Sequence, residues 1–353
     1  MEITYCKMSS SITKPVLVTG GSGFLGSWCV KILLDRGFMV HTTVRNEEKA
    51  QFLRNLPGAT ERLRIFPGVD LLEDGSFDDA MKGCECVLHT ASPFYMVGGT
   101  EESLVVPAVT GTRNVLNSCR KHGVSKVVLT SSTAAVYVTY GTVPVDHVYT
   151  GCDWSPEDLL REHSNWYCLS KTKAEALAWE MSREDGCPYQ LAVMNPTLIL
   201  GPQLPGQPHL NTSSAVVVGF MDGGMSEIEN SCKSIVDVRD VALAHVAALE
   251  HPEAFGHRFL LVGGSPHMRD IAEAVRRALP EELQRHVPTA ISDKLPPAVM
   301  AAPPPHPVLY DVSPSEQILG LSYVPVEEMI RTAVDSLLQN GFTSRSMYST
   351  DKL

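Results

Sequence analysis

The sequence lacks the surplus of positive charge that a nucleic-acid-binding surface requires. It has 29 Lys and Arg residues against 40 Asp and Glu residues, so its formal net charge is −11 over 353 residues. Phosphate backbones are bound by clustered Lys and Arg side chains, and this composition offers no basic stripe of that kind. Nucleic acid is therefore not an expected partner.

Two further absences concern the cell compartment and metals. No apolar run approaches the length of a bilayer span, and the start, MEITYCKMSSSITKP, has no basic segment followed by an apolar one. Nine cysteines without regular spacing are typical of a reducing compartment rather than of a disulfide framework. The close pair Cys84 and Cys86 has no partner pair with which to form a zinc site. These patterns predict a cytoplasmic protein without a membrane segment or a metal.

What the sequence has is an alternation of short apolar runs with amphipathic segments. Six runs are expected to be strands buried on both faces, and they span residues 16–20, 39–45, 63–70, 84–92, 126–132 and 190–201. Helices are expected between them, in FLGSWCVKILLDRG, ESLVVPAVTGTRNVLNSCRKHG and NWYCLSKTKAEALAWE. Because strands that alternate with helices form βαβ units, the predicted fold class is α/β with a doubly wound parallel sheet of the Rossmann type.

The pattern changes after residue 201, where connections rich in proline and glycine begin. Residues 14–195 are predicted to form the Rossmann domain, to which residues 232–263 return as a strand and a helix. Residues 196–231 and 264–345 are predicted to form a smaller region that ends in the amphipathic helix VEEMIRTAVDSLLQNG, closed by a glycine. Residues 294–307 lack the backbone donors that a helix or sheet needs. Residues 1–13 and 346–353 are expected to be disordered tails.

Three glycines mark the turn between the first strand and the first helix. In VLVTGGSGFLGS an apolar strand runs into Gly20, Gly23 and Gly26 and then into a helix. One glycine permits the tight turn, one lets backbone N–H groups approach a pyrophosphate, and one permits close packing of helix on strand. The helix N-terminus adds positive potential. Glycines alone also fit a flexible turn, but their position in the first βα unit favours a dinucleotide site.

Charged residues after the next two strands bear on which dinucleotide is bound. Arg45 ends the second strand, at the place where NAD-binding proteins usually have an acidic residue for the ribose 2′-hydroxyl. A guanidinium pairs with a 2′-phosphate, and Lys49 adds charge, so NADP(H) is the expected cofactor. An arginine that is merely solvated at a strand end is the alternative. Asp70, after the third strand, is a candidate acceptor for the adenine amino group.

A serine, a tyrosine and a lysine are expected to converge at one edge of the sheet. The strand in KVVLTSSTAAVY ends in Ser131 and Ser132, at the carboxyl edge where open α/β sheets bind ligands. In isolation such a serine is equally a turn or cap residue. Tyr167 and Lys171 lie one turn apart on the buried side of a helix. Alone, that pair also fits a lysine that reaches solvent past a packed tyrosine.

Together these motifs resemble the extended short-chain dehydrogenases/reductases over nearly the whole chain. TVRN, TSSTAAVY, NWYCLSK and NPTLILGP are similar to the group of dihydroflavonol reductases, cinnamoyl-CoA reductases and fungal methylglyoxal/ketone reductases. The resemblance implies an NADP(H)-dependent enzyme, a monomer or homodimer whose smaller region binds substrate. It implies that Ser132, Tyr167 and Lys171 are catalytic. It extends the expected cofactor contacts to Phe24, Leu25, Leu71, Thr90, Ala91, Ser92, Tyr167, Lys171 and Pro196.

The chemistry of carbonyl reduction suits these residue types. Hydride transfer to a carbonyl creates an alkoxide that must take up a proton, and a free tyrosine with a pKa of about 10 is poorly matched to neutral pH. An ammonium group nearby favours the phenolate and lowers that pKa. Lys171 is therefore expected to tune Tyr167 and to bind the nicotinamide ribose, while Ser132 donates to the carbonyl oxygen.

The expected substrate is a small uncharged aldehyde or ketone. SNWYCLSK matches only half of the signature KNWYCYGK of cinnamoyl-CoA reductases, and Val216 and Gly219 stand where those enzymes have a histidine and a lysine that help to hold the CoA phosphate. A mostly apolar cleft offers no fixed cation to a CoA thioester. Cinnamoyl-CoA reduction, dihydroflavonol reduction and nucleotide-sugar epimerisation are the alternatives, and Arg45 disfavours the last because epimerases commonly hold NAD. The expected lining is Phe94, Tyr95, Thr133, Tyr137, His209 and Asn211.

Overall fold

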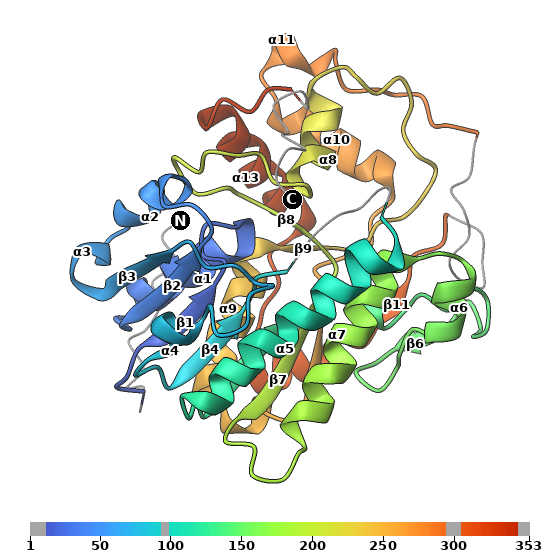
Figure 1. Ribbon diagram of the computed structural model, residues 1–353. Helices are drawn as coiled ribbons and strands as arrows, with labels where there is room; N and C mark the ends of the chain where they lie inside the picture. Colours follow the sequence, from blue (N-terminus) through green and yellow to red (C-terminus); the bar gives the residue numbers. More distant parts are fainter. Residues whose placement is uncertain (1–11, 93–98, 294–304, 345–353) are drawn as a thin grey trace.

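A seven-stranded sheet forms the centre of the computed structural model, which describes residues 12–92, 99–293 and 305–344 (Figure 1). Its strands are β1 (Val16–Thr19), β2 (Val40–Val44), β3 (Leu63–Pro67), β4 (Cys86–His89), β5 (Lys126–Thr130), β7 (Gln190–Pro196) and β10 (Arg258–Leu261). Their order is β10-β7-β5-β4-β1-β2-β3, and every pairing is parallel. The strand order reverses direction at β1, as in doubly wound folds. The predicted fold class is confirmed.

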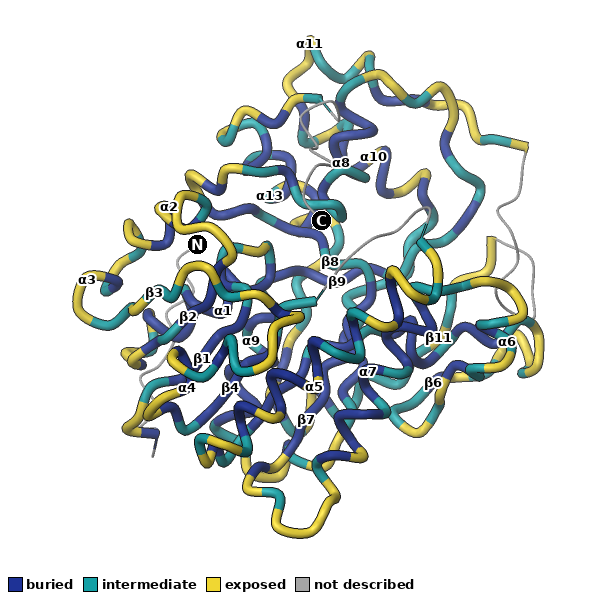
Figure 2. Tube along the Cα trace, viewed as in Figure 1, coloured by how far each residue is buried: buried dark blue, intermediate teal, exposed yellow. Residues whose placement is uncertain are grey.

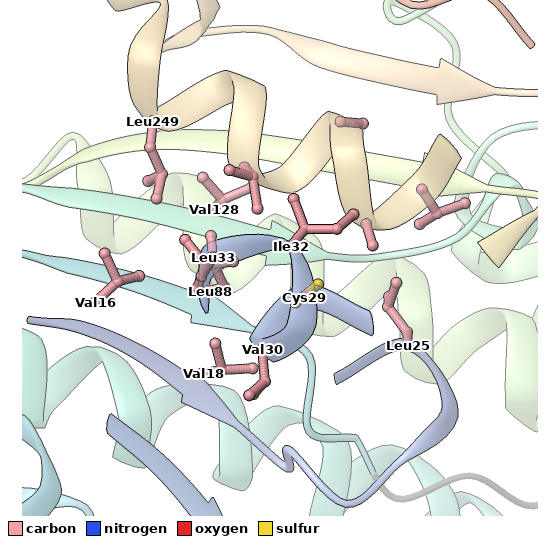
Figure 3. Packing of buried hydrophobic residues seen from close by; sticks show 14 of the residues in the cluster. Val16, Val18, Leu25, Cys29, Val30, Ile32, Leu33, Leu88, Val128 and Leu249 are labelled. Carbon is pink, nitrogen blue, oxygen red and sulfur yellow. The ribbon is translucent and has the colours of Figure 1, made fainter. Parts of the chain in front are cut away.

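Helices cover both faces of this sheet. One layer contains α1 (Phe24–Asp35) and α9 (Val238–Glu250), and the other contains α4 (Asp78–Met81), α5 (Val106–Lys121) and α7 (Trp166–Ser182). Because side chains alternate along a strand, Val16 and Val18 pack with the first layer and Leu17 packs with the second. Figure 3 shows the two valines beside Val30 and Leu33 of α1. Burial of both strand faces leaves only the strand ends for chemistry.

Strand β3 differs from the prediction that it is buried on both faces. Its five residues are half-buried or exposed, as Figure 2 shows at the edge of the sheet. The physical reason is its place in the strand order, since β3 pairs with β2 alone. An apolar run in the sequence does not tell a central strand from an edge strand.

The run at residues 190–201, predicted as one strand, forms two strands in different sheets. The central strand β7 ends at Pro196, and β8 (Leu198–Leu200) pairs with β9 (Ile235–Asp237) in a separate two-stranded sheet. The break falls at Thr197, whose N–H donates to the carbonyl of Leu261 in β10 at 3.1 Å. The long helix expected after Glu102 is also divided, because η2 (Glu101–Val105) is a π-turn that leads into α5.

Four further helices gather beyond the carboxyl end of β7 and enclose a third apolar cluster. This region contains α8 (Ser214–Met221), α10 (Met268–Ala278), α11 (Glu281–Gln284) and α13 (Val326–Gln339). In Figure 1 these helices lie together at the top of the molecule. Gly341, with φ of +77°, follows the end of α13. The strand β9 and helix α9 lead back into β10 of the central sheet.

Short elements connect these layers. They are η1 (Glu48–Ala50), α2 (Gln51–Arg54), α3 (Ala59–Arg62), η3 (Thr133–Ala135), β6 (Val148–Tyr149), α6 (Glu157–Glu162), η4 (Pro252–Ala254), β11 (Leu309–Tyr310) and α12 (Ser313–Leu319). Strands β6 and β11 pair with each other. Of the predicted N-terminal tail, Ile12 is described, and it packs in the core cluster of α1 and α9. The rest of that tail before residue 12, the last nine residues and most of the proline-rich segment lie outside the described residues.

Candidate active site

The turn between β1 and α1 is built from glycines whose surroundings leave no room for a side chain. Gly20 has φ of +72°, and a Cβ on Gly26 would lie 2.4 Å from the carbonyl oxygen of Gly20. Helix α1 begins after Gly23 without a side-chain cap. The first N–H groups of a helix have no partner within it, so here they face the space after β1, where an anionic group would be stabilised. This cradle fits a dinucleotide pyrophosphate.

The sequence reasoning missed Gly21, which is equally constrained. A Cβ on Gly21 would lie 1.9 Å from the hydroxyl oxygen of Thr42 in β2. Its N–H donates to the carbonyl of Thr43 at 3.1 Å, which ties the turn to the neighbouring strand. The glycine doublet in the sequence was the available signal.

The residues predicted to select the cofactor follow β2 and β3. Arg45 comes directly after β2, the strand that pairs with β1, and it is exposed, while Lys49 in η1 is half-buried. Asp70 is exposed after β3, and its Oδ1 accepts the N–H of Leu72 at 2.9 Å. Because β1 and β2 are parallel neighbours, Arg45 stands at the same edge of the sheet as the glycine turn.

Ser132, Tyr167 and Lys171 come together from two elements. Ser132 follows β5, where its Oγ accepts the N–H of Ala134 at 3.1 Å and starts η3. Tyr167 and Lys171 lie one turn apart near the start of α7, which Asn165 caps. The side chains of Ser132 and Tyr167 are hydrogen-bonded. The predicted triad therefore meets at the carboxyl edge of the sheet.

The end of β4 completes this edge. Lys171 Nζ donates to Ser92 Oγ at 3.1 Å. Thr90 and Ala91 are held by β1, because Thr90 Oγ1 donates to the Thr19 carbonyl and the Ala91 N–H donates to Thr19 Oγ1. The predicted contacts Leu71, Ala91 and Ser92 line one small cavity with Lys171. Phe24 and Leu25 occupy the first turn of α1, and the Pro196 carbonyl accepts from Ser132 and Thr133.

Burial shifts the protonation of this group. Lys171 is 8% exposed, and desolvation lowers its pKa to about 8, against the opposing charge of Glu175. Burial raises the pKa of Tyr167 above its usual value, while the hydrogen bond with Ser132 acts in the opposite direction. Burial lowers the pKa of nearby His89 to about 3, and Lys171 adds to that shift. At neutral pH this edge therefore holds a buried ammonium beside a protonated phenol.

The residues predicted to line the substrate cleft differ in their burial and in their contacts. Thr133 is buried, and the ring of half-buried Tyr137 lies edge-on to Tyr149 and Tyr310, at centroid distances of 6.4 and 6.2 Å. The pairing of β6 with β11 brings those two tyrosines together, and nothing in the sequence indicated them. Phe94 and Tyr95 lie outside the described residues.

The residues around α8 are apolar, or their polar groups make hydrogen bonds to residues nearby in the sequence. Asn211 lies just before this helix and is bonded to its first residue: Asn211 Oδ1 accepts the Ser214 N–H at 3.0 Å, and Asn211 Nδ2 donates to Ser214 Oγ at 2.8 Å. His209 is half-buried, and its carbonyl accepts from Gln203. Val216 and Gly219 lie within α8, whose sequence SAVVVGFM has no charged side chain.

Neither a membrane-spanning helix nor a metal-binding cluster occurs among the described residues. Across residues 12–92, 99–293 and 305–344, no helix is long and apolar enough to cross a membrane. Within those same ranges, no group of three His, Cys, Asp or Glu residues is arranged to hold a metal ion.

Known proteins are similar to this chain in sequence and in fold. The NAD dependent epimerase/dehydratase family matches residues 16–263. Cinnamoyl-CoA reductase 1 of Petunia hybrida is 40% identical, with 95% of each chain covered. Gre2 of Candida albicans, solved in complex with NADPH, is 30% identical with a TM-score of 0.79, covering 92% of this chain and 99% of that one. Yeast methylglyoxal/isovaleraldehyde reductase Gre2, complexed with NADPH, is 29% identical with a TM-score of 0.79, over 93% and 99%.

The fold and the site thus define an oxidoreductase of the extended short-chain type, which uses a nicotinamide dinucleotide. The chain belongs to the NAD dependent epimerase/dehydratase family, and within it to the reductases. The resemblance noted in the sequence is confirmed.

Proposed function

We propose that this protein is an NADPH-dependent reductase that converts an aldehyde or ketone to an alcohol. One observation carries the proposal: the hydrogen-bonded pair of Ser132 and Tyr167 lies beside the buried ammonium of Lys171, at the sheet edge that also holds the glycine turn. These are the groups that a carbonyl needs when it accepts a hydride and a proton.

The cofactor side of the proposal is supported by the space around the glycines. A Cβ at Gly26 would clash with the backbone of Gly20, so glycine there keeps the first turn of α1 close to the end of β1, and the pyrophosphate is expected to lie against Gly20 to Gly23 and that first turn. The exposed Arg45 is expected to pair with the 2′-phosphate, and both Gre2 structures were solved with NADPH. When bound, the cofactor supplies the hydride.

The chain's own side chains divide the remaining work. Ser132 Oγ–H donates to the substrate carbonyl oxygen and stabilises the charge that develops on it. The Tyr167 hydroxyl delivers the proton to that oxygen. Lys171, as an ammonium, favours the phenolate that remains and binds the ribose hydroxyls. Burial of Lys171 strengthens both effects because water screens the charge less.

We propose a small uncharged carbonyl compound as the substrate, and residues 196–231 and 264–345 as the region that shapes its end of the cleft. The support is the aromatic group of Tyr137, Tyr149 and Tyr310 and the absence of charge from α8. A CoA thioester carries phosphates that require charge-assisted partners. The name of the yeast relative, a methylglyoxal/isovaleraldehyde reductase, agrees with this choice.

Reduction of cinnamoyl-CoA is the second candidate. It is favoured by the 40% identity to cinnamoyl-CoA reductase 1 of Petunia hybrida over nearly the full length of both chains. The half-matched signature SNWYCLSK around Tyr167 points the same way. The two candidates share the same catalytic groups and differ in what holds the rest of the substrate.

Replacement of Tyr167 by Phe tests the reaction. Tyr167→Phe should reduce kcat for carbonyl reduction by about 10²–10⁴-fold, because the positioned proton donor is lost. Binding of NADPH, followed by its fluorescence, should remain close to that of the wild type. A Tyr167→Phe enzyme with near-normal kcat would reject the mechanism.

A substrate panel separates the two candidates. Methylglyoxal, diketones, aromatic aldehydes, dihydroflavonols and cinnamoyl-CoA would be compared by the loss of NADPH absorbance. We expect the highest kcat/KM with an uncharged aldehyde or ketone and weak activity with cinnamoyl-CoA. If cinnamoyl-CoA gives the highest value, the choice of substrate made from α8 is wrong, while the role of Tyr167 stands.

A further inference from the structure

Glu175, one turn beyond Lys171 on α7, is a fully buried carboxylate that the reaction itself does not use. Its side chain is 0% exposed, and it accepts hydrogen bonds from Ser131 Oγ at 2.6 Å and from Asn195 Nδ2 at 2.8 Å. Arg258 Nε donates to its other oxygen at 2.5 Å. A buried charge is costly unless it is fully paired, and removal of one partner is more costly still. Because each oxygen of the Glu175 carboxylate has a partner, we infer that its charge has a role in the protein.

The partners of Glu175 come from the ends of three neighbouring strands. Ser131 follows β5, Asn195 lies in β7, and Arg258 begins β10. The side chain of Arg258 is only 6% exposed. Its guanidinium also donates to the carbonyls of Gly151 and Asp153. A single carboxylate therefore connects α7 to three neighbouring strands, near the carboxyl ends of β5 and β7 and at the start of β10.

Ser132 stands at the carboxyl end of β5. Ser131 directly precedes it, and the Ser131 N–H donates to the Met194 carbonyl in β7 at 2.8 Å. Asn195 Nδ2, the group that binds Glu175, also donates to the backbone carbonyl of Ser132 at 3.1 Å. Glu175 thus connects the helix that carries Tyr167 and Lys171 to the backbone that carries Ser132.

The charge of Glu175 also bears on Lys171. The two side chains line the same small cavity, and their positions on α7 differ by one turn. Arg258 donates to Glu175 through Nε and Nη2, while its Nη1 donates to the carbonyls of Gly151 and Asp153. The carboxylate raises the pKa of Lys171 against the desolvation that lowers it to about 8.

The other groups that face Lys171 do not supply a counter-charge. Burial lowers the pKa of His89 to about 3, and burial raises that of Tyr167, so both are neutral at pH 7. The remaining lining of the cavity is uncharged and comes from β5, α5, α7 and the segments that follow β3, β4 and β5: Leu71, Ala91, Ser92, Ala108, Thr112, Leu129, Thr130, Ser131 and Ala174.

We propose that Glu175, held by Arg258, is a positioning residue of the active site: its carboxylate sets α7 against the strand ends and is the counter-charge of Lys171. The inference rests on the proposed function, because it assigns Glu175 a purpose in the work of Tyr167 and Lys171. It predicts two separable consequences of losing the carboxylate, one in the geometry and one in the protonation of Lys171.

The principal test replaces Glu175 by Gln. At pH 7 we expect kcat/KM to fall by roughly 10- to 100-fold, the range for small misplacements of reacting groups. We also expect the alkaline limb of the pH profile, where Lys171 loses its proton, to move to lower pH by at least about half a unit. The same acid shift should appear in the pH dependence of NADPH binding, a readout that needs no substrate turnover.

A matched control is the partly buried pair of Arg36 and Glu250, which joins α1 to α9 away from the site. Glu250→Gln should lose stability in the same way as Glu175→Gln but leave the alkaline limb in place. Ser131→Ala keeps the carboxylate and removes one of its donors. That variant should lower kcat several-fold without moving the limb, which isolates the geometric part.

A double variant guards against misfolding. Glu175→Gln combined with Arg258→Met removes both charges, and neutral replacement of a buried pair often restores stability. We expect it to fold and to keep the acid shift in NADPH binding. An unmoved limb in both the single and the double variant would overturn the inference. Suppose that Tyr167→Phe is inactive but the alkaline limb of the pH profile is unmoved in both Glu175 variants. The proposed function then stands, and only the role of Glu175 fails.

Discussion

Replacement of Lys171 by Met is expected to stabilise the protein while it abolishes activity. The ammonium is 8% exposed, and burial lowers its pKa from 10.5 to about 8. Since one pKa unit corresponds to about 1.4 kcal/mol, the folded state bears a cost on the order of 3 kcal/mol for the charged form. Loss of the hydrogen bond to Ser92 offsets about 1 kcal/mol of the gain. Met fills a similar volume, so we expect a net stabilisation of about 2 kcal/mol at pH 7.

The pH dependence gives this prediction its sign. Below pH 8 Lys171 is protonated in both the folded and the unfolded state, so the full cost is present. Between pH 8 and 10.5 the folded state releases the proton and the unfolded state retains it, so the wild type becomes more stable relative to the variant. The advantage of Lys171→Met should therefore be largest at pH 7 and should shrink as the pH rises to 9.5.

Urea unfolding of the cofactor-free protein at pH 7 and pH 9.5 measures both quantities. Lys126→Met is a control, because that lysine is half-buried and donates to the Leu249 carbonyl away from the site. It should show no such gain at pH 7. A Lys171→Met protein that is less stable than the wild type at pH 7, or equally stabilised at both pH values, would refute the reasoning. Its carbonyl reduction and its affinity for NADPH should both fall.

Two further variants test the cofactor site. Arg45→Asp should shift preference from NADPH toward NADH, because one charge-assisted phosphate contact contributes about 1.5–3 kcal/mol; equal kcat/KM for both cofactors in the wild type would contradict this. Gly26→Ala would place its Cβ 2.4 Å from the Gly20 carbonyl oxygen, so we expect NADPH affinity to fall at least tenfold and stability by about 1–3 kcal/mol. Gly37→Ala, at the far end of α1 with φ of +86° and open space around it, should cost stability alone, and unchanged NADPH binding in Gly26→Ala would argue against the cradle.

The sequence determined the parts of this protein that depend on neighbours along the chain. Alternating apolar runs and amphipathic segments predicted the parallel sheet and its helices, because strand and helix periods are local properties. The spacing of the glycines predicted the turn after β1, and the four-residue spacing of Tyr167 and Lys171 placed both on one face of α7. Each of these features depends only on residues within about one turn of helix or one strand.

The tertiary structure decided what depends on distant segments. The edge position of β3 and the break at Thr197 follow from which strands are neighbours, and a single apolar run carries no information about that. Arg258 meets Glu175 across 83 residues of sequence. Either residue alone reads as an exposed charge, since buried charges are rare in sequences of this kind. Only the placement of β10 beside β7 excludes water from both side chains and gives the carboxylate its partners.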